Sequence, residues 1–294
     1  MAPQLMQESV GSRKRLTQKI AFILFRFFSL SIVAILFAIL FFIIKNGIGV
    51  INWDFLSKAP QEGMTSGGIF PAIVGTLCLV IGSCLFSFPI GIMSGIYMNE
   101  YAKNGKLISF IRIMTNNLSG VPSVVFGLFG MSLFVNFLGF GDSIIAGSLT
   151  LGLMSLPLVI RTTEEALKSI DNSFREGSLA LGATQLETIR KVILPMALPN
   201  IITGLILSIG RVSGETAPIL FTAVAYFLPQ LPTSIFDQVM ALPYHLYVIS
   251  TSGTDIEASR GMAYGTALVL IFIVLILNLI ANMIRKHFTD KNKI

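Results

Sequence analysis

Long apolar segments constrain this chain more than any other feature of its sequence. The first, residues 20–44, carries a single charge, Arg26, which is near enough to one end to extend toward the membrane interface. A helix of about 20 apolar residues crosses the ~30 Å hydrocarbon core of a bilayer. Only 12% of the residues are charged, whereas soluble domains have about a quarter. The sequence therefore predicts an all-α, polytopic membrane protein.

Five further spans are expected, which makes six transmembrane helices. They cover residues 71–99, 107–137, 143–160, 199–221 and 261–284. The remaining segments are a tail at 1–19, outer loops at 45–70 and 223–260, a coupling loop at 161–195 and a tail at 285–294. Pro89 is expected to interrupt the second span, because proline lacks an amide donor. Gly91 and Gly95 form a GxxxG face there, which favours close helix packing.

The lysines and arginines predict the orientation. Of 21 in the chain, Lys45, Lys58 and Arg260 fall in the expected outer segments and Arg211 falls inside a span. The others lie on the side of the two tails, and an excess of basic residues marks the cytoplasmic side. Both termini and the loop 161–195 are therefore expected in the cytoplasm. The net charge of +6 then reflects topology and not a nucleic-acid partner.

The polar stretch at 173–195 has the signals of two short helices. Ser173 and Glu176 have capping-box spacing, which predicts a helix that begins at about residue 174. Gly182 is suited to the left-handed conformation that ends a helix. Thr184 and Glu187 repeat the capping-box spacing and predict a second helix. So well-defined an element between two apolar segments indicates a docking surface; the alternative is a capped loop without a partner.

The same stretch resembles the EAA loop of ATP-binding-cassette (ABC) importer permeases. That family pattern is E-A-A, three residues, Gly, nine residues, and then I-x-L-P. Small residues replace both alanines here, Val192 replaces the isoleucine, and every spacing is kept. The resemblance implies a coupling helix that docks into a groove on a cytoplasmic ATPase subunit. The matching residues are Glu176, Gly177, Ser178, Gly182, Leu194 and Pro195, of which Pro195 is expected to stop or redirect the second helix.

Arg211 and Glu215 are the only ionisable residues deep in an expected span. A charge at the bilayer centre costs at least about 2.5–3.5 kcal/mol on insertion scales, so it usually has a function. Their four-residue spacing places both side chains on one helix face. A guanidinium suits an anion pathway, because it stays protonated and its planar donors match phosphate or sulfate oxygens. The alternative is a self-neutralising structural pair.

Helix breaks are expected on either side of this chemistry. Pro218 is expected to break the fifth span just beyond Glu215. Gly120 and Pro122 are expected to break the third span in its middle. A broken helix start there would present free amides, which favour anions. A simple packing kink explains the same residues equally well.

Residues 210–222, Gly-Arg-Val-Ser-Gly-Glu-Thr-Ala-Pro-Ile-Leu-Phe-Thr, resemble the G-R-x-x-G-E-T-A-P-L-L-F-T signature of the PstA family. These are permease subunits of phosphate ABC importers and have the MetI-like, type I permease fold. Residues 67–77, 97–101 and 117–130 are similar to further motifs of that family, and the likeness covers roughly 50–285. The resemblance implies inorganic phosphate as the transported solute. It also implies a PstC-like sister permease, a PstB-like ATPase dimer and a PstS-like extracytoplasmic phosphate-binding protein.

Energy for transport is expected to come from a partner. The sequence contains no G-x-x-x-x-G-K-[ST] phosphate loop, so the chain is predicted to be non-catalytic, with ATP and Mg²⁺ on the ATPase subunit. No cofactor or metal is expected on this chain. A permease for sulfate or molybdate is the alternative within this class, and a proton-coupled secondary transporter using Glu215 is the alternative outside it. The loop 223–260 is a candidate contact for the binding protein, or equally a lid over the permease.

Overall fold

A computed structural model describes residues 2–102, 105–252 and 256–291, without the side chains of 2–16, 256–258 and 290–291. Several basic residues on which the predicted orientation rests lie outside this description, namely the side chains of Arg13, Lys14, Arg15, Lys103, Lys291 and Lys293. The remaining basic residues near the same end of the molecule are described.

Helices form most of the described structure. The longer ones are α1 (Ala2–Gly47), α3 (Phe70–Ile96), α4 (Lys106–Leu118), α6 (Ile144–Lys168), α9 (Leu194–Ser213) and α12 (Ile256–Lys291). The shorter ones are α2 (Trp53–Ser57), α5 (Ser123–Gly130), α7 (Asn172–Ala180), α8 (Gln185–Thr188), α10 (Ala217–Leu220) and α11 (Leu242–Thr251). Three π-helical segments, Tyr97–Tyr101, Met131–Phe137 and Ile189–Ile193, continue α3, α5 and α8. Two-residue strands β1 (Pro60–Gln61) and β2 (Ser66–Gly67) pair antiparallel around a 3₁₀ turn, Glu62–Met64.

The helices confirm the expected all-α, polytopic fold. Within the described residues, five helical stretches are long and apolar enough to cross a membrane: Thr17–Gly47, Phe70–Tyr101, Ile144–Lys168, Gln185–Ser213 and Ser259–Thr289. The pair Lys106–Leu118 and Ser123–Phe137 meets the same requirement together, with a bend of 103° between its halves. Counted as one span, this pair gives six.

Several predicted boundaries are corrected by the structure. Pro89 does not interrupt its helix, because α3 runs through it. Helix α6 continues past Ile160, the predicted end of the fourth span, to Lys168, and its last two turns carry ion-paired side chains. Pro195 does not stop the helix that starts at Gln185. It occupies the first turn of α9, where the missing amide disturbs the chain least, and the π segment joins α8 to α9.

The α3–α6 pair forms the centre of the bundle. A Cβ added to Gly91 would lie 2.6 Å from Val159 Cγ1, and one added to Gly95 would lie 2.7 Å from Thr163 Cβ. The predicted small-residue face is therefore a close packing face. Next to it, Leu79, Leu151 and other buried side chains of α3, α6 and their neighbours make a continuous apolar core.

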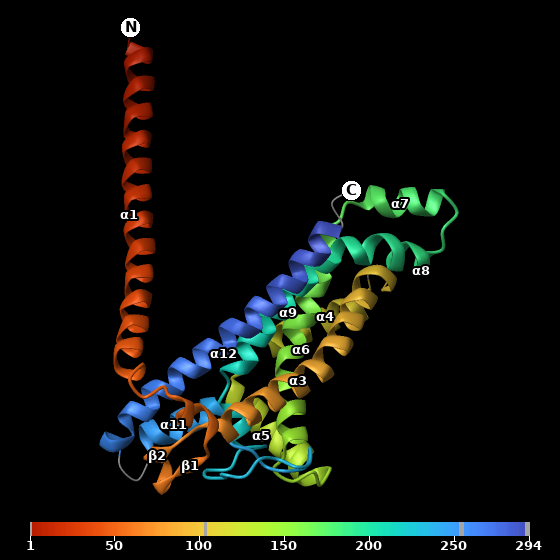
Figure 1. The fold of residues 1–294 in the computed structure, drawn as a ribbon. Helices are drawn as coiled ribbons and strands as arrows, with labels where there is room; N and C mark the ends of the chain where they lie inside the picture. The colour runs from red at the N-terminus through yellow and green to blue at the C-terminus, as the bar shows by residue number, and fades with distance from the viewer. Residues whose placement is uncertain (1, 103–104, 253–255, 292–294) are drawn as a thin grey trace.

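The two ends of the chain are placed differently. Helix α1 stands apart over most of its length and meets α12 near its own C-terminal end, where Phe42 packs edge-on against Tyr264 at 5.6 Å (Figure 1). The C-terminal end of α12 lies at the same end of the molecule as α7 and α8 (Figure 1). The outer loop expected at 223–260 contains α11, which packs onto α12 and α3.

Candidate functional site

Helix α7, the predicted coupling helix, begins earlier than expected. Its N-cap is Asp171, whose Oδ1 accepts a hydrogen bond from the Ser173 amide at 2.8 Å. This backbone hydrogen bond lowers the pKa of the Asp171 carboxyl. The predicted capping box between Ser173 and Glu176 is therefore wrong, because both residues lie inside a helix that Asp171 has already capped.

The turn and second helix of this hairpin are as predicted. Gly182 has a φ of +85°, which is the left-handed conformation that glycine adopts at little cost. The Thr184 hydroxyl accepts from the Glu187 amide at 3.3 Å, and the Glu187 carboxylate accepts from the Thr184 amide at 3.1 Å. The latter bond, together with Lys191, lowers the pKa of Glu187. Local sequence alone therefore builds a helix, a turn and a second helix.

The residues of the EAA-like pattern divide into exposed and packed ones. Glu176 and Gly177 are exposed, and nothing lies within 4 Å of a Cβ added to Gly177 or Gly182. The Ser178 hydroxyl instead bonds Thr188 at 2.9 Å, which ties α7 to α8. Leu194 and Pro195 are partly buried at the start of α9. Part of the hairpin surface is thus open to a partner.

The exposed part of the hairpin carries apolar side chains. Leu181 at its tip is 90% exposed, and Phe174, Leu179 and Leu186 are about half exposed or more. The hairpin is polar in sequence and extends beyond the apolar helices, so lipid tails do not account for this exposure. A cluster of exposed apolar side chains on a short rigid element is typical of a protein contact.

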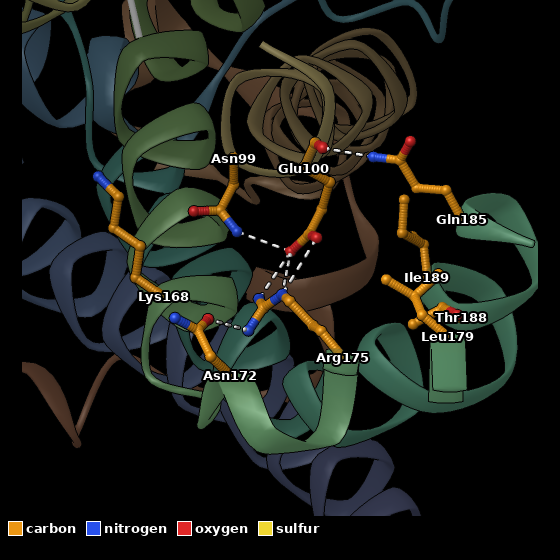
Figure 2. A pocket seen from close by; sticks show the side chains of 9 residues that line it. All are labelled: Asn99, Glu100, Lys168, Asn172, Arg175, Leu179, Gln185, Thr188 and Ile189. Atoms are coloured by element: carbon orange, nitrogen blue, oxygen red, sulfur yellow. Dashed lines mark hydrogen bonds and ion pairs between the residues drawn. The ribbon is translucent and has the colours of Figure 1, made fainter. Parts of the chain in front are cut away.

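Sequence reasoning missed an ion pair behind the hairpin. Arg175 on α7 lies 2.7 Å from Glu100 on the π segment that ends α3, and their side chains are only 17% and 7% exposed. Figure 2 shows the Arg175 guanidinium directed at the Glu100 carboxylate, beside Asn99. Gln185 Nε2 also donates to the Glu100 carbonyl at 2.7 Å. The only signal in the sequence was that Glu100 belongs to the family-like motif at 97–101.

A second buried carboxylate lies nearby, on α6. Glu164 pairs with Arg112 of α4 at 2.9 Å and with Lys168 at 2.7 Å. Arg112 also donates to the Met98 carbonyl at 3.2 Å. Charged side chains therefore connect α3, α4 and α6 to one another at the end that is predicted to be cytoplasmic.

Arg211 and Glu215 lie together, but not on one helix face as predicted. Helix α9 ends at Ser213, so Glu215 lies past its end, and the separation from Arg211 Nε to Glu215 Oε1 is 3.5 Å. Arg211 occupies the last turn, where the partial negative charge of a helix C-terminus favours a cation. The side chains are 39% and 20% exposed. This is an open, loosely paired site and not a sealed one.

The structure also places the predicted helix breaks. The chain leaves helical geometry at Gly214, before Pro218, which instead lies in the first turn of α10. Gly214 is four residues before Pro218, which cannot donate a hydrogen bond to the Gly214 carbonyl, so the predicted role of Pro218 in the break stays a prediction. Gly120 and Pro122 lie between α4 and α5, at the 103° bend. Helix α5 packs on α10, because a Cβ on Gly127 would lie 2.9 Å from the Ala217 carbonyl oxygen.

Helices that span a membrane, combined with a short capped hairpin beyond them, define the permease class of ABC importer subunits. Residues 87–293 match the family described as binding-protein-dependent transport system inner membrane component. The chain belongs to this family. It is accordingly a multi-pass inner-membrane protein.

Individual relatives match over most of the chain. The probable ABC transporter permease protein YqgI of Bacillus subtilis is 36% identical over 292 residues, which cover 94% of this chain and 99% of that protein. The phosphate transport system permease protein PstA 1 of Mycobacterium tuberculosis is 35% identical over 243 residues, 82% and 77% of the two chains. A bacterial alginate ABC transporter, solved with its alginate-bound periplasmic protein, has a similar fold, with a TM-score of 0.66 at 16% identity over 92% and 96%.

Proposed function

We propose that this chain is a membrane-spanning permease subunit of an ATP-driven importer of inorganic phosphate. The observation that carries the proposal is the Arg211–Glu215 pair, which lies at a helix break inside the signature at 210–222. Relatives named as phosphate transport permeases support the choice of solute.

The geometry of the pair favours a transport role over a purely structural one. Among the described residues, the Arg211 guanidinium makes no hydrogen bond, and its contact with Glu215 is a long one at 3.5 Å. Its donors are therefore available to phosphate oxygens, which planar guanidinium groups bind in pairs. Glu215 pairs with the Arg211 guanidinium when no anion is bound. Its negative charge also repels an anion bound to Arg211, so the anion is released again.

Energy for phosphate transport comes from a separate, PstB-like ATPase dimer, which docks on the hairpin 172–188. Its contact includes Glu176, Gly177 and the exposed Leu181, and this chain contributes no catalytic residue. A PstC-like sister permease completes the pathway past Arg211. A PstS-like binding protein delivers phosphate to the outer face, where the loop 223–260 is either its contact or a lid over the permease. This arrangement places both termini in the cytoplasm.

The test is transport by the assembled complex in proteoliposomes with ATP inside and binding protein outside. Arg211→Ala is expected to lower phosphate uptake by about a hundredfold, because it removes the charge-assisted donors that bind the anion. Arg211→Lys keeps the charge without the planar donors and is expected to retain part of the uptake. Lys45→Ala, which removes an exposed positive charge from the last turn of α1, away from the contacts proposed here, is the control.

Three results would contradict the proposal. Full uptake by the Arg211→Ala complex would remove Arg211 from the pathway. Competition by sulfate or molybdate at equal concentration would point to another oxyanion. Uptake that persists without the ATPase subunit would favour a secondary transporter that uses Glu215.

A further inference from the structure

The π segment Tyr97–Tyr101, at the end of α3, is held from three directions. Arg112 of α4 donates to the Met98 carbonyl at 3.2 Å. Gln185 of α8 donates to the Glu100 carbonyl at 2.7 Å. Arg175 of α7 pairs with the Glu100 carboxylate at 2.7 Å (Figure 2). The end of α3 is therefore bound directly to both helices of the hairpin.

The Glu100–Arg175 contact is the most buried ion pair described at the hairpin end, ahead of Arg112–Glu164 at 31% and 10% exposed. Its side chains are 7% and 17% exposed, whereas those of Arg161–Glu165 are 60% and 59% exposed. Exposed pairs contribute little, because water competes for both charges. A buried pair resists separation strongly, because each partner would be left as an uncompensated charge. Sliding α7 away from α3 is correspondingly unfavourable.

Arg175 also reaches the end of α6. Its Nη2 donates to the Leu167 carbonyl at 2.9 Å and its Nη1 to the Ile170 carbonyl at 3.0 Å. One side chain thus joins α7 to both helices of the central pair. Further along the two helices, α3 and α6 are in close contact, as the approach of Gly91 to Val159 indicates. Densely packed helices transmit displacement and do not absorb it.

We propose that the Glu100–Arg175 ion pair is the link through which movement of α7 reaches α3 and α6. Both residues are positioning residues, and neither touches the transported solute. The proposal rests on the proposed function, because it takes α7 to be the element that an ATPase subunit moves. It assigns a role to a contact between residues 75 positions apart in sequence.

The first test compares ATP hydrolysis with transport in Glu100→Gln, Arg175→Gln and the double variant. The ATPase subunit is expected to co-purify normally and to hydrolyse ATP at a similar rate, while uptake falls about tenfold, as the loss of a coupling free energy predicts. The double variant is expected to be no worse than either single one, because both singles remove the same link. Arg175→Lys is expected to be intermediate, and Glu165→Gln, on the exposed pair, unchanged.

Three outcomes of this comparison overturn the link. If uptake and ATP hydrolysis fall together with the amount of bound ATPase, the pair only supports docking. If the two single effects multiply in the double variant, the residues act independently. Unchanged uptake in all three variants would also exclude the role.

A second test does not depend on the solute. Spin labels at Tyr97→Cys and Leu181→Cys, both exposed, report the separation of the α3 end from the hairpin tip after Cys78→Ser and Cys84→Ser. In the complex with ATPase we expect a narrow distribution of label-to-label distances that ATP does not change. In the Glu100→Gln variant we expect a broader distribution. If ATP changes the distance between the two labels in the protein that keeps Glu100 and Arg175, the link is refuted, even where transport is normal. If no complex takes up phosphate but the distance between the labels stays constant, only the proposal that phosphate is the solute is refuted.

Discussion

At the residue scale, His245 shows how burial changes a side chain that the sequence left without a role. It lies on α11, 1% exposed, with Nδ1 3.4 Å from the Thr266 hydroxyl. Its Nε2 has no hydrogen-bond partner among the described residues. Burial lowers the pKa of His245 from 6.5 to about 4, so the ring is neutral at physiological pH.

The consequence is a loss of stability in acid. The unfolded chain takes up a proton on this ring at about pH 6.5, whereas the folded chain does so only at about pH 4. The contribution is complete above the unfolded pKa and is lost as the pH falls through this window. Between pH 7 and pH 5 the free energy of unfolding is expected to fall by about 2 kcal/mol through this residue. Thermal unfolding in detergent measures it, and an equally steep decline in His245→Gln would assign the effect to other groups.

At the element scale, the small residues of α3 decide how closely it approaches α6. A Cβ on Gly95 would lie 2.7 Å from Thr163 Cβ and 2.9 Å from the Ile160 carbonyl oxygen, so two rigid helices would have to move apart. Gly95→Ala is expected to lower the free energy of unfolding by roughly 1–3 kcal/mol, as overpacking does. The thermal midpoint of the purified protein checks this.

Gly210→Ala provides the matched control for this substitution. It makes the same change inside α9, where the nearest atom to an added Cβ, on Asn278, is 3.8 Å away. Alanine favours a helix by up to about 1 kcal/mol over glycine, so this variant is expected to be neutral or slightly stabilised. Equal destabilisation of both variants would mean that α3 and α6 are not in close contact.

At the scale of the whole molecule, the hairpin of α7 and α8 extends from one end of the bundle with an open surface (Figure 1). Glu176→Lys reverses a charge on that surface without touching the fold. A like-charge or mismatched contact at an interface costs several kcal/mol, so ATPase binding is expected to fall by about tenfold or more. Co-purification in mild detergent measures the loss, with Glu165→Lys, at an exposed position of α6, as control. Unchanged ATPase binding would remove Glu176 from the contact.

Much of the fold follows from local patterns. Apolar runs long enough to cross a bilayer locate the spanning helices. Lipid offers no hydrogen-bond partners, and a helix pairs its backbone groups within the same segment. The turn at Gly182 and the box at Thr184 are set by residues within four positions of each other, so spacing alone predicts them. Arg211 and Glu215 were predicted as site residues because they are ionisable residues deep in an expected span and lie in the family-like signature at 210–222.

The remaining features depend on contacts between distant parts of the chain. Whether Pro89 interrupts a helix depends on its packed neighbours, and here α3 continues through it. The pairing of Glu100 with Arg175, and the burial of His245 against Thr266, join positions that no local spacing relates. Apolar length and capping chemistry are properties of one continuous stretch of sequence, so the sequence reveals them directly. Buried ion pairs and close helix contacts form only when separate helices meet, so folding alone determines which side chains become partners.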